Sequence, residues 1–223
     1  MRLSIVMPVL DEAAGIQTTL HNLAPLRARG HELIIVDGGS ADGTPALAAG
    51  GADLGIDGPR GRARQMNAGA ARARGSVLLF LHADTLLPEG ADVRVQRALA
   101  GGRRWGRFDV RIAGRSPWFG VIAALMNLRS RLSGIATGDQ AIFVERALFE
   151  QLGGYAELPL MEDVELCRRL RVTGLPACLR ERVLTSGRRW ESRGIWRTVF
   201  LMWRLRWRYW RGEAPETLAR AYR

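Results

Sequence analysis

The chain has 223 residues, of which 47% are hydrophobic and 25% charged, a composition typical of a folded globular protein rather than a disordered one. Its formal net charge is +11, and because the sequence contains no lysine, arginine carries the whole cationic excess. Guanidinium groups bind phosphate through paired hydrogen bonds, so this excess favours a nucleotide, nucleic-acid or anionic-lipid partner. A coding bias toward arginine is the alternative explanation.

The chain shows no sign of export or of a membrane span. The apolar run Met1–Leu10 meets the acidic pair Asp11–Glu12 at once, which is unlike a secretory signal. The longest apolar stretch, Trp118–Met126, is far shorter than the roughly 20 residues that cross a bilayer. Cys167 and Cys178 match no zinc spacing, and a disulfide between them stays open. We therefore expect a cytoplasmic protein, with membrane association on the cytoplasmic face as a further option.

The N-terminal third alternates apolar strands with helical segments. Strands are expected at Leu3–Val9, Glu32–Val36 and Leu78–Leu81, and helices at about Leu20–Leu26 and Asp42–Ala49. Strands and helices alternating at this spacing predict a mostly parallel sheet with right-handed crossovers.

Each predicted strand is followed by a carboxylate, namely Asp11, Asp37 or Asp84. Ligands bind at the carboxyl ends of parallel strands, so three acidic strand ends at one edge predict a nucleotide cleft. A carboxylate there can hold a divalent cation together with phosphate oxygens. The alternative for Asp84 is that it only caps the turn after its strand.

A loop rich in glycine and arginine, Asp57–Arg64, precedes a predicted helix from about Arg64 to Arg74. Its backbone N–H groups and guanidinium groups suit a diphosphate. We mark Arg62, Arg64 and Asn67 as candidate phosphate or base contacts, although a solvated loop explains the pattern as well.

The middle of the chain contains two polar segments beside regular elements. Alternating apolar and charged residues predict an exposed strand at Trp105–Ile112, and Gly138–Gln140 directly precedes a short strand, Ala141–Val144. Glu162 and Asp163 begin a predicted helix that runs to about Val172. Their acidity either complements the helix dipole or supplies the base that a transferase needs. Further helices are predicted at Ala91–Gly102, Ser116–Ser133 and Arg146–Leu152.

The segment from Gly194 to Gly212 predicts an amphipathic helix with an aromatic stripe and an arginine stripe beside it. The aromatic stripe consists of Trp196, Phe200, Trp203, Trp207 and Trp210. Tryptophans flanked by arginines are typical of a helix that lies in a membrane interface. Packing on the core domain or on a second subunit accounts for the same pattern. No nucleic-acid-binding motif accompanies it, so no nucleic-acid partner is expected.

Five motifs in order resemble a family 2 glycosyltransferase of the GT-A fold over nearly the whole chain. They are Val6–Glu12, Val36–Thr44, Phe80–Thr85, Glu162–Leu166 and Ser186–Trp190. The combination LHADT, GDQAIF, MEDVEL and RRW is most similar to a bacterial subgroup called radical-SAM/selenodomain-associated transferase 2, which is linked to arsenosugar biosynthesis. The resemblance implies an α/β fold with a mostly parallel central sheet flanked by helices, followed here by an amphipathic helical tail.

The resemblance also implies roles for individual residues. Asp163 would be the general base of an inverting sugar transfer, with Glu162 beside it. Arg188 and Arg189 would assist the leaving diphosphate. The donor, expected to be UDP-linked, would bind at Pro8, Asp11, Glu12, Asp37, Gly39 and Asp84, and we add Arg64 and Asn67, the candidate contacts from the arginine-rich loop and its helix. The acceptor or sugar would contact Asp139, Gln140 and Trp190.

The family's paired metal-binding acids are altered in this chain, because His82 stands where the first acid is expected. A divalent metal, Mn²⁺ or Mg²⁺, would therefore rest on Asp84, helped by a neutral His82. We divide the chain into a transferase domain, 1–190, and an extension, 191–223. The donor sugar and the acceptor, either a small metabolite or a lipid, stay open.

Two alternatives to a glycosyltransferase remain at this point. A nucleotidyltransferase of related architecture would carry an early glycine-rich loop with arginine or lysine, where this chain has Asp11–Glu12. A non-enzymatic module that binds membrane or nucleic acid through the arginine- and tryptophan-rich tail is the second.

Overall fold

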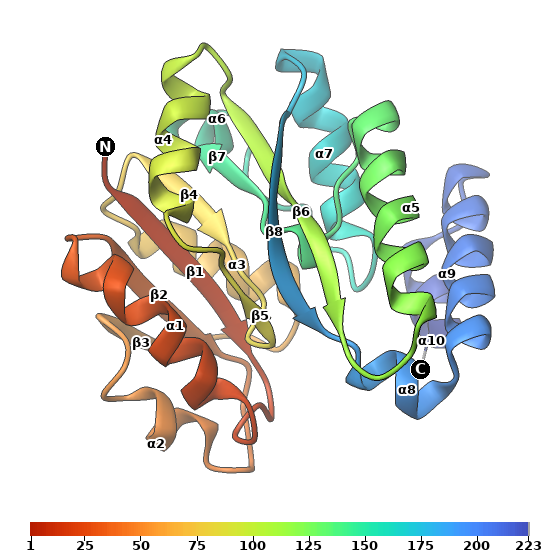
Figure 1. The fold of residues 1–223 in the computed structure, drawn as a ribbon, viewed down its shortest axis with the longest axis horizontal. Helices are drawn as coiled ribbons and strands as arrows, with labels where there is room; N and C mark the ends of the chain where they lie inside the picture. The colour runs from red at the N-terminus through yellow and green to blue at the C-terminus, as the bar shows by residue number, and fades with distance from the viewer. Residues whose placement is uncertain (223) are drawn as a thin grey trace.

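The apolar runs of the N-terminal third become neighbouring strands of one sheet in the computed structural model, which describes residues 1–222 (Figure 1). Within these residues the sheet has eight strands in the order β3-β2-β1-β4-β7-β6-β8-β5. The strands are β1 (Leu3–Val9), β2 (Glu32–Asp37), β3 (Leu54–Asp57), β4 (Val77–Phe80), β5 (Thr85–Leu86), β6 (Trp105–Ala113), β7 (Phe143–Glu145) and β8 (Ala177–Ser186).

The sheet is parallel in its first half and mixed in its second. Strands β3, β2, β1 and β4 run parallel, as the alternation of strands and helices predicts. Strand β7 is antiparallel to both of its neighbours, β6 is parallel to β8, and β5 is antiparallel to β8. In the parallel half Val9 lies opposite Asp37, so the carboxyl ends of β1 and β2 share one edge.

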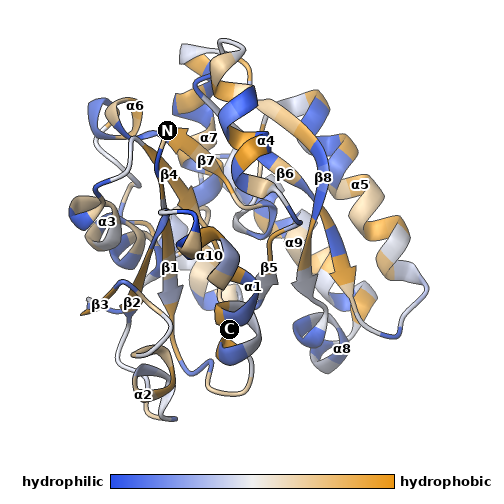
Figure 2. Cartoon of the chain, turned by 60° about the vertical axis from the view of Figure 1, so that its left-hand side comes forward, coloured by the Kyte–Doolittle hydropathy of each residue, from blue (hydrophilic) through white to orange (hydrophobic). Residues whose placement is uncertain are grey.

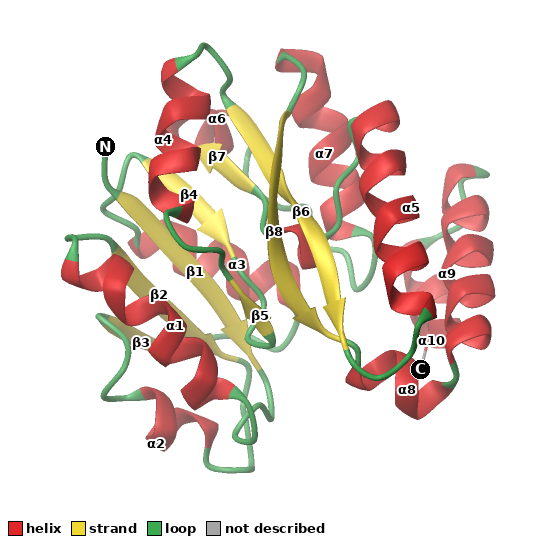
Figure 3. Cartoon of the chain, viewed as in Figure 1, coloured by secondary structure: helices red, strands yellow, loops and turns green. Residues whose placement is uncertain are grey.

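Helices cover both faces of this sheet (Figure 3). Apolar residues of α1 and α4 pack on one face, and those of α3, α6 and α7 on the other. The strands β1 and β4 between these layers are mostly hydrophobic (Figure 2). The helices are α1 (Ile16–Ala28), α2 (Thr44–Ala48), α3 (Arg62–Arg72), α4 (Ala91–Ala100), α5 (Trp118–Ser133), η1 (Gly138–Gln140, a 3₁₀ turn), α6 (Arg146–Gln151), α7 (Glu162–Thr173), α8 (Arg188–Arg193), α9 (Ile195–Trp210) and α10 (Pro215–Tyr222).

Strand β6 is largely buried, so the prediction of an exposed strand at this position is wrong. Eight of its residues are buried or half-buried, and Arg107 is 1% exposed. Arg107 forms an ion pair with Asp109, which also accepts a hydrogen bond from Arg131 of α5 at 2.6 Å. These charged side chains of β6 pair with one another beneath α5, so they are buried although their alternation with apolar residues predicts that they face solvent.

Three strands had no counterpart in the sequence prediction: β3, β5 and β8. Strand β5 has two residues, and β3 and β8 mix charged and small residues with apolar ones, so neither periodicity nor hydrophobicity marks them. The boundary proposed at residue 190 falls within α8. Cys167 and Cys178 are both free thiols.

Helix α9 packs on the domain by the face that carries Thr198, Val199 and Leu205. Leu205 of α9 and Leu218 of α10 form a small core with Leu160 and Met161, directly before α7. The predicted aromatic stripe stays outside, with Trp203 60% exposed and Trp210 79% exposed. No helix in the described part of the chain combines the length and the apolar character that a bilayer span requires.

Candidate active site

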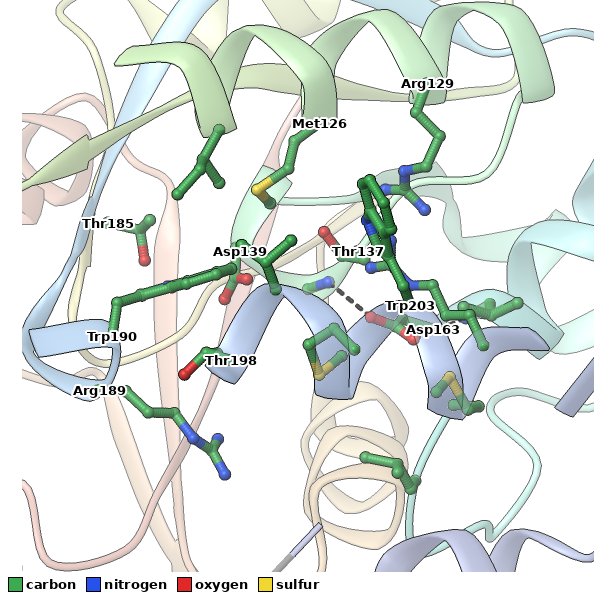
Figure 4. Close-up of a pocket in the computed structure, with 18 of the residues that line it drawn as sticks. Met126, Arg129, Thr137, Asp139, Asp163, Thr185, Arg189, Trp190, Thr198 and Trp203 are labelled. Atoms are coloured by element: carbon green, nitrogen blue, oxygen red, sulfur yellow. Dashed lines mark hydrogen bonds between the residues drawn. The ribbon is translucent and has the colours of Figure 1, made fainter. Parts of the chain in front are cut away.

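Two pockets of about 690 Å³ each lie at the carboxyl edge of the sheet. The arginine pocket, as we name it, lies between the ends of β1 and α3, and it is lined by Pro8, Glu12, Arg60, Arg62, Arg64 and Glu157 among others. The apolar pocket lies between α5 and α9, and its walls include Met126, Leu128, Met202 and Trp203 (Figure 4). Arg62, His82 and Asp84 line both, so the two pockets meet at these three side chains.

The junction is held by contacts among polar side chains and one close backbone approach. His82 Nδ1 lies 3.3 Å from Asp139 Oδ1, and Thr85 Oγ1 donates a hydrogen bond of 3.3 Å to Asp84 Oδ1. A Cβ atom on Gly138 would lie 2.4 Å from His82 Nε2, so only glycine leaves room for the imidazole here. Gly138 and Asp139 of η1 therefore constrain the position of His82.

Glu162 and Asp163 begin α7 at the wall of the apolar pocket. Asp163 accepts hydrogen bonds from the backbone N–H groups of Gly138 (2.9 Å) and Val164 (2.7 Å), which fix the orientation of its carboxylate. Glu162 is 6% exposed. Burial, and next the charge of Asp163, raise the pKa of Glu162 to about 7. A carboxyl group with that pKa titrates in the range where enzymes move protons.

Three residues other than glycine have positive φ angles within residues 1–222, and each lies in a predicted motif. They are Asp11 (55°), Ala141 (45°) and Met161 (69°). A left-handed backbone at such residues is uncommon and is often found at functional sites. At Met161 this conformation turns the chain directly into α7 and so places Glu162 and Asp163.

Part of the predicted donor set lines the arginine pocket: Pro8, Glu12, Arg64 and Asp84. Arg64 also pairs with Glu157 at 3.0 Å on the rim. Arg188 reaches the same region, because its Nη2 lies 3.1 Å from Glu12 Oε2 and so links the end of β8 to the end of β1.

The rest of the predicted donor set lines neither pocket. Asp37 accepts hydrogen bonds from the backbone N–H groups of Gly39 and Ser40, and Asp11 accepts one from Ala41, so both carboxylates close the loop after β2. Asn67 bonds to the backbone of Tyr155 through both its amide nitrogen and its oxygen. In this structure these side chains hold loops together, and their contact with a donor stays a prediction.

Of the predicted acceptor residues, Asp139 and Trp190 line the apolar pocket, together with Arg189, which was predicted to assist the leaving diphosphate. Gln140 does not: it is completely buried and donates to Ser130 at 3.0 Å. The guanidinium carbon of Arg189 lies 4.1 Å from the ring centre of Tyr222. Tyr222 lines the apolar pocket and Glu216 the arginine pocket, so α10 forms part of the wall of both.

Two arginines of the apolar pocket, Arg129 of α5 and Arg206 of α9, were not predicted from the sequence as site residues. Arg206 continues the spacing Val199–Met202–Arg206, so it lies on the packed face of α9 and not on the exposed stripe. That spacing is the feature of the sequence from which Arg206 could have been predicted to face the domain. No pattern in α5 distinguishes Arg129 from its neighbours.

The residues at the junction fit a divalent metal only in combination with a ligand. Within residues 1–222, no three His, Cys, Asp or Glu side chains are grouped so that they could hold a metal ion. Mg²⁺ is commonly bound by one or two carboxylates while phosphate oxygens of a substrate complete its coordination. Asp84, with His82 beside it, fits that kind of site.

Solved structures similar to this chain confirm the predicted GT-A architecture. S. aureus TarS 1-349 in complex with UDP aligns with a TM-score of 0.65 at 17% identity, over 83% of this chain and 60% of that one. The mannosyltransferase PcManGT from Pyrobaculum calidifontis, in complex with GDP-Man and Mn²⁺, aligns with a TM-score of 0.63 at 21% identity, over 82% and 56%. The chain therefore spans less than two thirds of the length of either structure.

Two further comparisons concern sequence. The uncharacterized glycosyltransferase Rv1514c of Mycobacterium tuberculosis (strain ATCC 25618 / H37Rv) is 31% identical over 193 residues, which cover 79% of this chain and 71% of that protein. The model of glycosyl transferase family 2 matches residues 4–143, from β1 to the start of β7. With this match over more than half of its length, the chain belongs to glycosyl transferase family 2.

Proposed function

We propose that this protein transfers a sugar from a nucleotide-diphosphate sugar to a hydroxyl group of an acceptor, with inversion at the anomeric carbon. The observation that carries the proposal is the meeting of two pockets at Arg62, His82 and Asp84, with the carboxylates of Glu162 and Asp163 on the wall of one of them. Neighbours of the same fold bind UDP or GDP-Man with Mn²⁺, which supports a nucleotide donor. The subgroup associated with radical-SAM proteins remains a prediction.

The arginine pocket suits the donor. Arg60, Arg62 and Arg64 present guanidinium groups to a diphosphate, and Pro8 and Glu12 would contact the nucleoside. We assign a UDP-linked donor because UDP is bound by a structural neighbour. Asp84, with His82 beside it, would hold a bound Mn²⁺ or Mg²⁺, which would neutralise charge on the departing diphosphate.

The carboxylate of Asp163 suits the general base. As the acceptor oxygen forms a bond to the anomeric carbon, its proton passes to Asp163, and the bond from that carbon to the diphosphate oxygen breaks. Attack from the face opposite the diphosphate inverts the configuration. Arg189 lines the same pocket and would stabilise charge on the leaving group.

Substituting Asp163→Asn tests the base. We expect transfer to fall by about 10²-fold or more, because the amide cannot accept the proton, while thermal stabilisation by UDP and Mn²⁺ persists. Glu162→Gln is the matched control on the neighbouring residue. Unchanged turnover in Asp163→Asn, with loss in Glu162→Gln, would transfer the role to Glu162.

A thermal-shift screen of nucleoside diphosphates, with and without Mn²⁺, tests the donor. We expect UDP to raise the melting temperature most and Mn²⁺ to increase its effect. Stabilisation by none of the nucleotides would refute the proposed donor site.

A further inference from the structure

The apolar pocket opens along a groove between α5 and α9 that is exposed on the outside of the molecule. Leu125, Leu128 and Leu132 of α5 line the pocket and are 53%, 52% and 79% exposed. Trp203 of α9 faces them and is 60% exposed. An alkyl chain would bury apolar surface along the whole of this wall, which a small polar acceptor is too short to cover.

Two guanidinium groups inside this groove lack partners. Nε and Nη2 of Arg129 and Nε of Arg206 are buried without a hydrogen-bond acceptor among the described residues. Buried polar atoms are rarely left in that state unless a ligand, an ion or water completes them. Figure 4 shows Arg129, Trp203 and Asp163 at one end of the pocket, while Arg189 and Trp190 lie at the other.

The charges around these two arginines favour an anion. Burial, and next the charge of Arg206, lower the pKa of Arg129 to about 10. Burial also lowers the pKa of Arg206, against the attraction of Asp163 and Asp139. Asp163 attracts both arginines, but no described carboxylate forms a salt bridge with either, and the oxygens of Asp163 accept hydrogen bonds from Gly138 and Val164. Two neighbouring cations without a bound counter-ion suit a phosphate group.

We propose that the acceptor is an amphiphilic lipid that carries a phosphodiester and a free hydroxyl, with its phosphate at Arg129 and Arg206 and its chains in the groove between α5 and α9. This inference rests on the proposed function, because it names the acceptor of the same site. The volume of the pocket, about 690 Å³, lies in the range of small-ligand sites and suits a headgroup, with the chains continuing outward.

The surface around the groove is continuous with an exposed aromatic face. The rings of Trp118 and Trp196 are in contact, with centroids 5.0 Å apart, at the start of α5 and α9. Phe200, Trp207 and Trp210 extend this face along α9, with exposed fractions of 64%, 58% and 79%. Tryptophans beside arginines favour the interface of an anionic bilayer, so a lipid could enter the groove without leaving the membrane.

The transfer balances with such an acceptor. The headgroup hydroxyl loses its proton to Asp163, and its oxygen forms the new bond to the anomeric carbon. The bond between that carbon and the diphosphate oxygen breaks, and the nucleoside diphosphate leaves with both electrons. The phosphodiester of the lipid takes no part in bond making, so Arg129 and Arg206 are binding residues that place the hydroxyl near Asp163.

The test compares two soluble phosphodiesters: dihexanoyl phosphatidylglycerol, which has hydroxyls and chains, and glycerophosphoglycerol, the same headgroup and backbone without the chains. We expect the lipid probe to bind the full-length protein by calorimetry, and glycerophosphoglycerol to bind about tenfold or more weakly. Arg129→Gln/Arg206→Gln should weaken the lipid probe by about tenfold or more. Arg72→Gln/Arg74→Gln removes the same charge outside both pockets and should leave binding unchanged.

A second variant, Leu128→Ser, keeps the inference testable if the double arginine variant fails to fold, because Leu128 is half exposed. It should weaken binding of the lipid probe and leave binding of glycerophosphoglycerol unchanged. Equal binding of both probes would overturn the lipid assignment in favour of a soluble phosphorylated acceptor.

Loss of UDP binding in the double arginine variant, with lipid binding retained, would instead assign Arg129 and Arg206 to the donor diphosphate and would also overturn the inference. Failure of UDP to bind any variant would refute the proposed function while leaving the lipid measurements interpretable.

Discussion

At the scale of single residues, the site depends on positions where the backbone permits a close approach. Gly138 leaves room for the imidazole of His82, and the left-handed backbone of Met161 directs the chain into α7. The same arrangement buries Glu162 beside Asp163 and raises its pKa. A strained backbone or a buried carboxyl group costs free energy and persists only where the rest of the structure enforces it. In this protein such positions lie next to the two carboxylates and the junction of the pockets.

Gly138→Ala tests the close approach. The added Cβ would lie 2.4 Å from His82 Nε2, so the imidazole must move and its contact with Asp139 is lost. We expect sugar transfer and Mn²⁺-dependent UDP binding to fall, measured by product formation and calorimetry. Gly120→Ala is the control, since nothing lies within 4 Å of its Cβ position. Full activity in both variants would dismiss the role of His82.

Glu162→Gln tests the buried carboxyl group through the pH dependence of stability. The folded-state pKa of about 7 exceeds the ordinary 4.5, so between these values the folded protein keeps a proton that the unfolded chain has lost. Wild-type stability therefore falls as pH rises from about 4.5 to about 7, by on the order of 3 kcal/mol. Urea unfolding at pH 5 and pH 7.5 should show a smaller fall in Glu162→Gln, and equal falls would contradict the raised pKa.

At the scale of elements, a side chain of helix α5 bonds to the edge of β6 where no neighbouring strand is present. Strand β7 pairs with only Trp105 and Gly106 of β6, so that edge of β6 has no strand partner farther along. Asn127 of α5 takes this place, because its side chain accepts from the N–H of Val110 (2.8 Å) and donates to its C=O (3.0 Å). The amide thereby fixes α5, and with it one wall of the apolar pocket.

Asn127→Leu should remove this anchor. Leaving the N–H and C=O of Val110 buried without partners is expected to cost about 2–4 kcal/mol of unfolding free energy, measured by urea denaturation. Val121→Ala, an exposed position on the same helix, is the control and should change stability by less than about 0.5 kcal/mol. A cost below about 1 kcal/mol for Asn127→Leu, the value of a single ordinary hydrogen bond, would show that another group replaces the amide.

At the scale of the whole molecule, the C-terminal helices belong to the site as well as to the surface. Helix α10 contributes Glu216 and Tyr222 to the pocket walls, and α9 contributes Met202, Trp203 and Arg206. Removing residues 195–223 would therefore open both pockets and expose Leu160 and Met161. Surface substitutions separate the external role of the tail from its internal one.

Trp207→Glu/Trp210→Glu tests the membrane contact without disturbing the packed face of α9. We expect the wild type, and not this variant, to float with vesicles of phosphatidylcholine and phosphatidylglycerol, because two exposed interfacial anchors are lost. Stabilisation by UDP should be the same in both proteins. A different result would contradict the membrane contact: the wild type fails to bind vesicles and sediments as a dimer, and the variant sediments as a monomer. This face would then bind a second copy of the chain.

The sequence was sufficient for features that depend on neighbouring residues. Local hydrophobicity and spacing determined β1, β2 and β4 and the helices α3, α5, α7 and α9 to within a few residues, because periodicity reflects which face is buried. The alternation of these elements also predicted the parallel half of the sheet. The GT-A architecture was implied by the resemblance of the five motifs, and the comparisons confirm it. The order of the motifs identified the family.

Only the tertiary structure decided how distant side chains are used. Arg107 pairs with Asp109 beneath α5, and Asp37 and Gln140 form internal hydrogen bonds. Arg129 and Arg206, from two different helices, line one pocket. A charged residue has the same local pattern whether it faces water, a counter-ion or a ligand, and the difference lies in partners many residues away. For that physical reason the sequence predicted the acidic strand ends, but it did not predict the apolar pocket or its arginines.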